Sequence, residues 1–233
     1  MKTVNRDYKI CTLDKHLDCA ACEIASMVDC SRHRPQQMTR YYKVLAVYAI
    51  PGLAIMTFSS FLLEIWWLVP GYLLYWLFYQ IVGELGLRCR HCPFWDEASA
   101  TLNCRINCGV PKLHWLIPPS LRKYDPSPLK IWQKIVIQSL SILTILIPLV
   151  AGVTALAVLS QEGSLHTLSF AVMFALIMAQ IASGIYFILY LTRKLCATCV
   201  HFSCPNNRQP RDVIEKYLEK NEIMDQSEFL GRS

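Results

Sequence analysis

Charge is scarce in this sequence, and two long tracts carry no basic residue. Charged residues make up 17% of the 233 residues, whereas an average soluble domain has about 25%. No Lys or Arg occurs from Val44 to Leu87 or from Ile135 to Leu191. Such stretches are longer and less charged than buried helices of soluble proteins, so we expect an integral membrane protein.

Signatures of several enzyme classes are also missing. The chain has no Walker A motif, no Gly-rich dinucleotide fingerprint and no His-Glu-x-x-His zinc motif. The first 43 residues are polar and lack the apolar segment of a signal peptide, so we expect no cleaved leader.

Each apolar tract is long enough for two membrane spans, because one span needs about 20 residues. Pro70-Gly71 breaks the first tract, and the polar stretch 160–166 breaks the second. We therefore predict an all-α membrane protein with a four-transmembrane-helix bundle made of two hairpins, 44–87 and 135–191. The predicted helices cover about 44–67, 71–87, 135–159 and 168–191, and none contains a histidine that would serve as an axial haem ligand.

Basic residues predict the orientation of this bundle. Eight Lys or Arg lie in residues 1–43, eight in 88–134 and seven in 192–233, which accounts for all 23. The positive-inside rule makes these three segments cytoplasmic, with both termini inside the cell and the cytoplasmic membrane as the expected location. The net charge of +6 then belongs to a face beside anionic lipid, so the bilayer is the expected partner and nucleic acid is not.

All eleven cysteines fall in these three predicted cytoplasmic segments. They form three groups: Cys11, Cys19, Cys22 and Cys30; Cys89, Cys92, Cys104 and Cys108; Cys196, Cys199 and Cys204. Each group contains Cys-x2-Cys, a spacing that lets two thiolates bind one metal ion. Because the cytosol keeps thiols reduced, we expect metal sites there rather than disulfides.

The first two groups each supply four ligands, and we predict one metal site in each. The third group offers a further site, to which His201 would contribute the fourth ligand. The alternative is that cysteines from different groups bind one metal together, because all three segments leave the predicted bundle on one face. Cys89 and Cys196 follow the second and fourth predicted helices so closely that a cluster there would sit at the membrane surface.

The identity of the metal stays open between two candidates. Iron–sulfur ligand runs often end in Cys-Pro, and Cys92-Pro93 and Cys204-Pro205 match that feature. This favours iron–sulfur clusters, two of the 4Fe–4S type. Four cysteines, or three with a histidine, suit zinc as well.

Four polar residues in the predicted spans are candidates for a functional site: Gln80, Glu84, Gln138 and Gln180. Glu64 also lies in a predicted span, near its outer end, where we expect it to be hydrated. Ionisable and polar groups inside a bilayer are functional candidates. We predict a pocket for a quinone-like head group, with Glu84 handling protons. The alternative is that the amides hydrogen-bond between helices and hold the bundle together.

The soluble segments have two further features. A Pro-rich loop follows Cys108, and it would lie along the membrane interface or cover a metal site. A predicted amphipathic helix runs from Pro210 to about residue 230, and it would dock a partner or fold back on the loops.

These patterns lead to a first hypothesis and two alternatives. The first is a membrane iron–sulfur protein that passes electrons between a cytoplasmic donor and a quinone-like carrier or a membrane partner, as an oxidoreductase or the membrane subunit of one. The second is a zinc-stabilised membrane anchor that binds another protein on the cytoplasmic face. The third is a cytoplasm-facing protein for thiol redox chemistry or soft-metal handling.

Overall fold

The computed structural model describes residues 10–11, 22–29, 35–104, 106–107, 109–113, 115–161, 167–221 and 223–224. Within these ranges the regular structure is helical, and the only β pairing is an isolated bridge between Thr101 and Pro111. Cys19, Cys30 and Cys108 lie outside the described residues.

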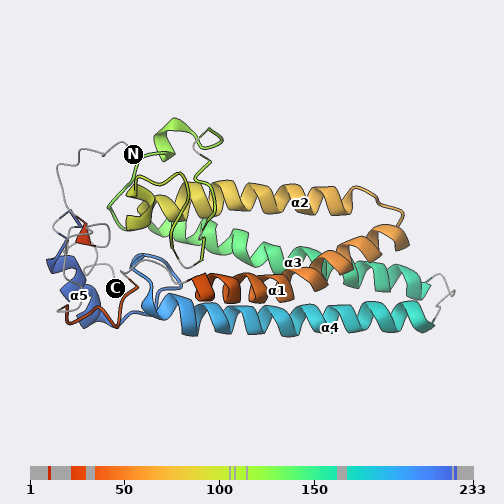
Figure 1. Cartoon of the computed structure of the whole chain (residues 1–233). Coiled ribbons are helices and arrows are strands. Elements are labelled where there is room, and N and C mark those ends of the chain that lie inside the picture. Colours follow the sequence, from red (N-terminus) through yellow and green to blue (C-terminus); the bar gives the residue numbers. More distant parts are fainter. Residues whose placement is uncertain are drawn as a thin grey trace. The chain divides into compact units, whose positions relative to one another are not determined.

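Five α-helices occur in the described chain (Figure 1): α1 (Pro35–Leu62), α2 (Leu68–Phe78), α3 (Ile131–Gln161), α4 (Thr167–Tyr190) and α5 (Arg211–Glu219). This confirms the predicted all-helical fold. The first four lie close to the predicted helices, although α1 begins nine residues before the predicted start at 44 because the polar residues ahead of Val44 continue the helix. The predicted break at Pro70-Gly71 is wrong: the turn lies at 63–67, where Glu64 has φ of 56°, and Pro70 falls in the first turn of α2, where a missing N–H costs no helical bond.

The helices α2 and α4 end in the same way. Each passes without a break into a π-helical segment, η3 (Tyr79–Arg88) after α2 and η7 (Leu191–Leu195) after α4. A 3-10 turn follows, η4 (Cys89–His91) or η8 (Cys196–Thr198), and it carries the first cysteine of a Cys-x2-Cys pair. A change from α to π geometry is frequent at functional sites.

Among the residues that the structure describes, three helical stretches are long and apolar enough to cross a membrane: Arg40–Leu62, Ile131–Val158 and Leu168–Thr198. The chain is therefore a helical, multi-pass membrane protein. The predicted second span is not among these three. There the chain passes from α2 into η3, which contains Gln80, Glu84 and Arg88 and is less apolar than the helices of the three candidate stretches. The four-span topology stays a prediction.

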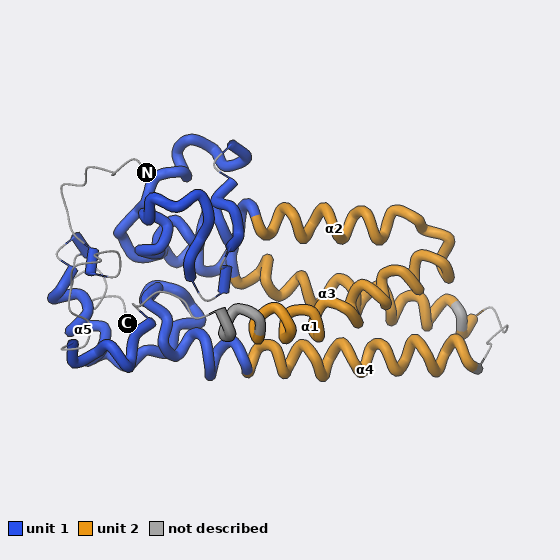
Figure 2. The backbone as a smooth tube through the Cα atoms, viewed as in Figure 1, with its two compact units in different colours: residues 1–39, 81–137, 190–233 blue, residues 40–80, 138–189 orange. Residues whose placement is uncertain are grey.

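The chain forms two compact units (Figure 2). Unit 2 comprises residues 40–80 and 138–189, which hold most of α1 to α4. Unit 1 comprises residues 1–39, 81–137 and 190–233, and all eight described cysteines belong to it. Three chain segments that are distant in sequence therefore fold together in unit 1.

The core of unit 2 joins α1, α3 and α4 through Ile55, Ala155, Met173 and Ile177. Gly152 allows this close packing, because a Cβ atom at that position would lie 3.0 Å from Ile55 Cγ2 and 3.2 Å from Ile177 Cγ1. Small residues at helix crossings are typical of membrane bundles, where close van der Waals contact stabilises association.

A seam of tyrosine hydroxyls joins α2 to α3. Tyr72, Tyr75 and Tyr79 lie on one face, at i, i+3 and i+7. Tyr72 Oη donates to the Thr144 carbonyl at 2.8 Å, and Tyr75 Oη donates to the Leu140 carbonyl. Tyr79 Oη lies 2.9 Å from Ser141 Oγ.

Pro148 explains the hydrogen bond from Tyr72 to the Thr144 carbonyl. Proline has no N–H, so the carbonyl four residues earlier, that of Thr144, loses its helical donor. A carbonyl without a donor is costly in a membrane, and a neighbouring helix has to supply the bond. Tyr72 of α2 supplies it.

We expect Tyr72→Phe to lower the free energy of unfolding in detergent by about 0.5–1.5 kcal/mol, because the Thr144 carbonyl loses its donor. In a Pro148→Ala background we expect a smaller loss, since the new N–H at residue 148 restores the helical bond and only the bond from Trp76 Nε1 to Tyr72 Oη, 3.1 Å long, is still removed. Tyr75→Phe is the matched control, because Leu140 has no proline four residues on. Equal losses from Tyr72→Phe in both backgrounds would contradict this account.

Candidate functional site

The main apolar cluster of unit 1 draws on all three cysteine-bearing segments. Ile24 comes from the N-terminal segment, Phe94 from the central loop and Tyr217 from α5. Cysteines of the first and second groups lie in or against this cluster: Cys11, Cys22, Cys92 and Cys104. The tertiary structure thus brings two sequence groups to one core.

The helix α5 closes this core. It begins directly after Pro210, as the sequence predicts, but it ends at Glu219, well before the predicted end near residue 230. It buries Val213, Tyr217 and Leu218. Of the two predicted roles for this amphipathic helix, the structure shows the one in which it folds back on the cysteine-bearing segments.

In the second group, one asparagine reaches two sulfur atoms. The backbone N–H of Asn107 donates to Cys104 Sγ at 3.3 Å, and its side-chain Nδ2 donates to Cys89 Sγ at 3.4 Å. Asn107 is buried. It therefore fixes two cysteines that are distant in sequence around a single residue.

The Pro-rich loop covers Cys89. A second apolar cluster contains Cys89, Leu85, Trp95, Leu102 and Ile117, and Ile117 belongs to that loop. The side chain of Cys89 is therefore buried on the side where the loop packs.

In the first group, the sulfur atoms receive donors from the far end of the chain. Asn221 Nδ2 donates to Cys11 Sγ at 3.2 Å, while the Cys11 N–H donates to Asn221 Oδ1 at 2.7 Å. Lys220 Nζ lies 3.3 Å from Cys22 Sγ. Sequence reasoning missed these residues, because nothing local relates Lys220 and Asn221 to cysteines about 200 positions earlier.

The third group includes a buried histidine. The His201 N–H donates to Cys199 Sγ at 3.5 Å. The imidazole is buried, and its Nε2 has no hydrogen-bond partner among the described residues. Burial lowers the pKa of His201 to about 3, so the ring is neutral and one of its nitrogens has the lone pair that a metal ligand needs.

Burial also raises the pKa values of the thiols of Cys89, Cys92 and Cys199 well above the usual range. Negative charge on Cys104 would raise all three pKa values further. In the described part of the chain, no three His, Cys, Asp or Glu side chains lie close enough together to hold a metal ion.

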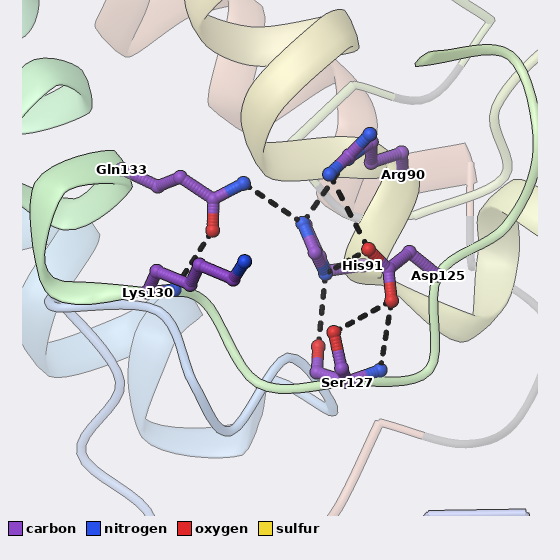
Figure 3. Close-up of polar contacts among 6 residues, drawn as sticks. All are labelled: Arg90, His91, Asp125, Ser127, Lys130 and Gln133. Atoms are coloured by element: carbon purple, nitrogen blue, oxygen red, sulfur yellow. Dashed lines mark hydrogen bonds and ion pairs between the residues drawn. The ribbon is translucent and has the colours of Figure 1, made fainter. Parts of the chain in front are cut away.

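His91 lies between Cys89 and Cys92 but has other partners (Figure 3). Arg90 Nε donates to His91 Nε2 at 3.1 Å, and Gln133 Nε2 lies 3.4 Å from the same nitrogen. The proton therefore sits on Nδ1, which donates to the Ser127 carbonyl at 2.9 Å. Desolvation lowers the pKa of His91, in keeping with a neutral ring.

This network fastens the Cys-x2-Cys turn to the start of α3. Asp125 accepts hydrogen bonds from Ser127 Oγ at 2.6 Å and from Arg90 NH2 at 3.3 Å (Figure 3). Gln133 Oε1 accepts from the Lys130 N–H at 2.7 Å, ahead of the first turn of α3. With both ring nitrogens engaged, His91 acts as a positioning residue for the turn.

The four residues of the predicted quinone-like pocket fall in different units. Glu84 belongs to unit 1, where its Oε1 accepts from Arg88 NH1 at 2.7 Å. Gln80, Gln138 and Gln180 belong to unit 2. Gln180 is 0% exposed, and neither its amide nitrogen nor its oxygen has a partner among the described residues. The pocket stays a prediction.

Comparisons with protein-family models, with curated proteins and with solved structures find no match to this chain.

The burial of Cys92 leads to a prediction about its reactivity. In metal-free protein we expect maleimide to label Cys92 at least tenfold more slowly at pH 8 than the partly exposed Cys22, because labelling follows thiolate fraction and access. Since the pKa of Cys92 is raised, its rate should keep rising by about tenfold per pH unit beyond pH 9, where an ordinary thiol levels off.

Tyr217→Leu is the matched perturbation for this measurement. It loosens the cluster that holds Cys92 but not the cluster that holds Cys89. Peptide mapping should show faster labelling of Cys92 with slow labelling of Cys89 retained. Equal acceleration at both positions would mean that the two clusters are not separate.

Proposed function

We propose that this chain is a membrane metal–thiolate protein that carries electrons, with iron–sulfur clusters held by its cysteine-rich unit. One observation carries the proposal: N–H groups are directed at sulfur atoms in all three cysteine groups. The buried position of Cys89 and Cys92 beneath two apolar clusters adds to it.

The physical argument rests on what a sulfur atom accepts. A neutral thiol is a weak acceptor, so donors aimed at Sγ stabilise it little. A thiolate bound to a metal carries negative charge and gains from each N–H group. Hydrogen bonds to cluster sulfur atoms are also among the features that set the reduction potential of iron–sulfur proteins.

The ligand sets follow the sequence groups. Cys11 and Cys22 with Cys19 and Cys30 would hold one cluster, and Cys89, Cys92 and Cys104 with Cys108 the other. Cys196, Cys199, Cys204 and His201 would hold a further metal or share one with the second group. When bound, a cluster supplies reversible one-electron transfer.

The chain's own residues would position and insulate these groups. Asn107, Lys220 and Asn221 donate to the sulfur atoms, and His91 fixes the turn between Cys89 and Cys92. Trp95 and Ile117 keep water from Cys89. Such a setting suits outer-sphere electron transfer, which needs a fixed environment and no substrate contact at the sulfur.

The proposed topology has four spans, with residues 68–88 as the second, and all cysteines on the cytoplasmic side. Electrons would enter from a soluble cytoplasmic partner and leave to a quinone-like carrier in the bilayer. Glu84 would exchange protons with that carrier. A fluorescent-protein fusion at the C-terminus tests the orientation, because it fluoresces when the tail is cytoplasmic.

Zinc is the second candidate, and one observation favours it. Unit 1 is assembled from three short segments, and structural zinc contributes folding energy to segments too short to form a core. The raised pKa values of Cys89, Cys92 and Cys199 count against the thiol-redox alternative, because the thiolate is the nucleophile in exchange.

Metal and sulfide content of protein purified without oxygen decides between these candidates. We expect about eight iron and about eight acid-labile sulfide per chain, with visible absorption that bleaches on reduction. Roughly one to three zinc ions per chain with no sulfide would refute the electron-transfer proposal and support the zinc-stabilised membrane anchor.

Substitution at the second site tests the ligand grouping. Cys92→Ser should remove one cluster and leave the other spectroscopically intact. Equal loss of both would show that the clusters do not follow the sequence groups.

Asn107→Ala tests the hydrogen bonds to sulfur. Loss of the Nδ2 donor to Cys89 Sγ should lower the midpoint potential of one cluster, because the more negative reduced state loses stabilisation. Asn103→Ala is the matched control, since Asn103 Nδ2 donates to Glu97 Oε2 at 2.6 Å and to no sulfur. An unchanged potential in Asn107→Ala would contradict the proposed role.

A further inference from the structure

The loop that contains Leu113 and residues 115–121 has an inner and an outer side. Ile117 is 1% exposed and lies in the apolar cluster around Cys89. Trp115 and Leu116, two residues and one residue earlier, are 75% and 40% exposed. The large side chain of Trp115 is therefore exposed, although the loop that carries it is packed on the apolar cluster through Ile117.

Two cationic side chains, one at each end of this loop, hold it in place. Lys112 Nζ donates to the carbonyls of Trp95 at 2.7 Å and Glu97 at 2.6 Å. Arg122 Nε donates to the Ile117 carbonyl at 2.8 Å. The exposure of Trp115 is thus imposed by a braced loop.

The backbone conformation of Leu113 also indicates that this loop is held in place. Leu113 has φ of 42°, a left-handed conformation that is unusual for a leucine. Such strain persists only where the surroundings hold it, and it concentrates at sites with a role. The side chain of Leu113 packs against the cluster around Cys89, so the strained turn is anchored.

The loop stands near the point where the chain enters the membrane. It packs on η3 through the cluster that contains Leu85. The segment η3 in turn packs on the start of α3, where Leu87 contacts Ile137 in a third apolar cluster. A candidate membrane span begins at Ile131, and Trp132 beside it is 55% exposed.

The outer side of the loop has the composition of a membrane-interface anchor. Trp115 and Leu116 are followed by two exposed prolines, and Arg122 and Lys123 are exposed as well. Tryptophan favours the headgroup region, where its ring is amphipathic. Basic residues near the surface attract anionic lipid.

We propose that this loop inserts Trp115 and Leu116 into the headgroup region of the bilayer that the chain's own helices cross, with Arg122 and Lys123 among anionic headgroups. The inner side of the same loop covers Cys89, so the loop separates that thiol from lipid. The proposal requires no metal, and its test is independent of metal content.

Photocrosslinking of the full chain in lipid nanodiscs tests the proposal. The photoreactive residue p-benzoylphenylalanine replaces Trp115, Trp132 or Arg211 in nanodiscs of mixed phosphatidylcholine and phosphatidylglycerol. Trp132 is the positive control at the start of a span. Arg211 is the control for water, because its side chain is 65% exposed on the charged face of α5.

We expect lipid adducts at positions 115 and 132 and none at 211. Lys123→Gln should lower the share of phosphatidylglycerol in the adducts at position 115 by roughly fivefold. Adducts to another polypeptide at position 115, or no adduct there while position 132 reacts, would overturn the proposal.

A second measurement uses the native tryptophan and avoids the unnatural residue. The fluorescence difference between the unsubstituted chain and Trp115→Phe isolates the emission of Trp115. We expect this emission to be quenched by lipids brominated close to the headgroup and little affected by iodide in the buffer. Quenching by iodide alone would place Trp115 in water and refute the proposal.

Discussion

The apolar cluster around Tyr217 is the interaction on which the cysteine-rich unit depends. Tyr217 is fully buried and packs edge to face against Phe202, with ring centroids 4.9 Å apart. The cluster also takes residues from the N-terminal segment and the central loop, and none of these segments is long enough to bury a core alone. Unit 1 therefore forms only when the chain has returned to it after each apolar hairpin. The same requirement explains why Lys220 and Asn221 supply donors to Cys22 and Cys11.

In the helix bundle, a backbone carbonyl that lacks its helical donor is satisfied by a side chain of a neighbouring helix. Pro148 removes one helical donor, and Tyr72 replaces it from a neighbouring helix. The sequence draws attention to the glutamines in the spans, but the described bonds between α2 and α3 come from tyrosines. Gln180 is instead buried against Gly52, where a Cβ atom would lie 3.2 Å from its Oε1. The absence of a side chain at Gly52 is what gives the amide its space.

The hydrogen-bond donors that lie beside cysteine sulfur atoms connect the fold to the proposed metal–thiolate chemistry. Asn107 reaches two cysteines of one group, and it can do so only because the loop between them folds back over Cys89. His91 serves that turn from the other side, through Arg90, Ser127 and Gln133. A ring nitrogen that accepts two donors is not free to bind a metal. His201, whose Nε2 has no partner among the described residues, is the histidine whose chemistry suits a ligand.

The helical class, the apolar tracts and the confinement of the cysteines to the segments outside those tracts could all be predicted from the sequence. These properties are local, because they depend on hydropathy over about 20 residues. The position of the first turn was predicted wrongly at Pro70-Gly71, because proline is tolerated in the first turn of a helix and the chain instead turns at 63–67. The sequence did not determine that α2 ends after 11 residues, because a change to π geometry leaves no mark on hydropathy. Only the folded chain shows which N–H groups donate to which sulfur atoms, and that both ring nitrogens of His91 are engaged in hydrogen bonds. Those outcomes depend on packing between residues as much as 210 positions apart, and no spacing rule within one segment encodes them.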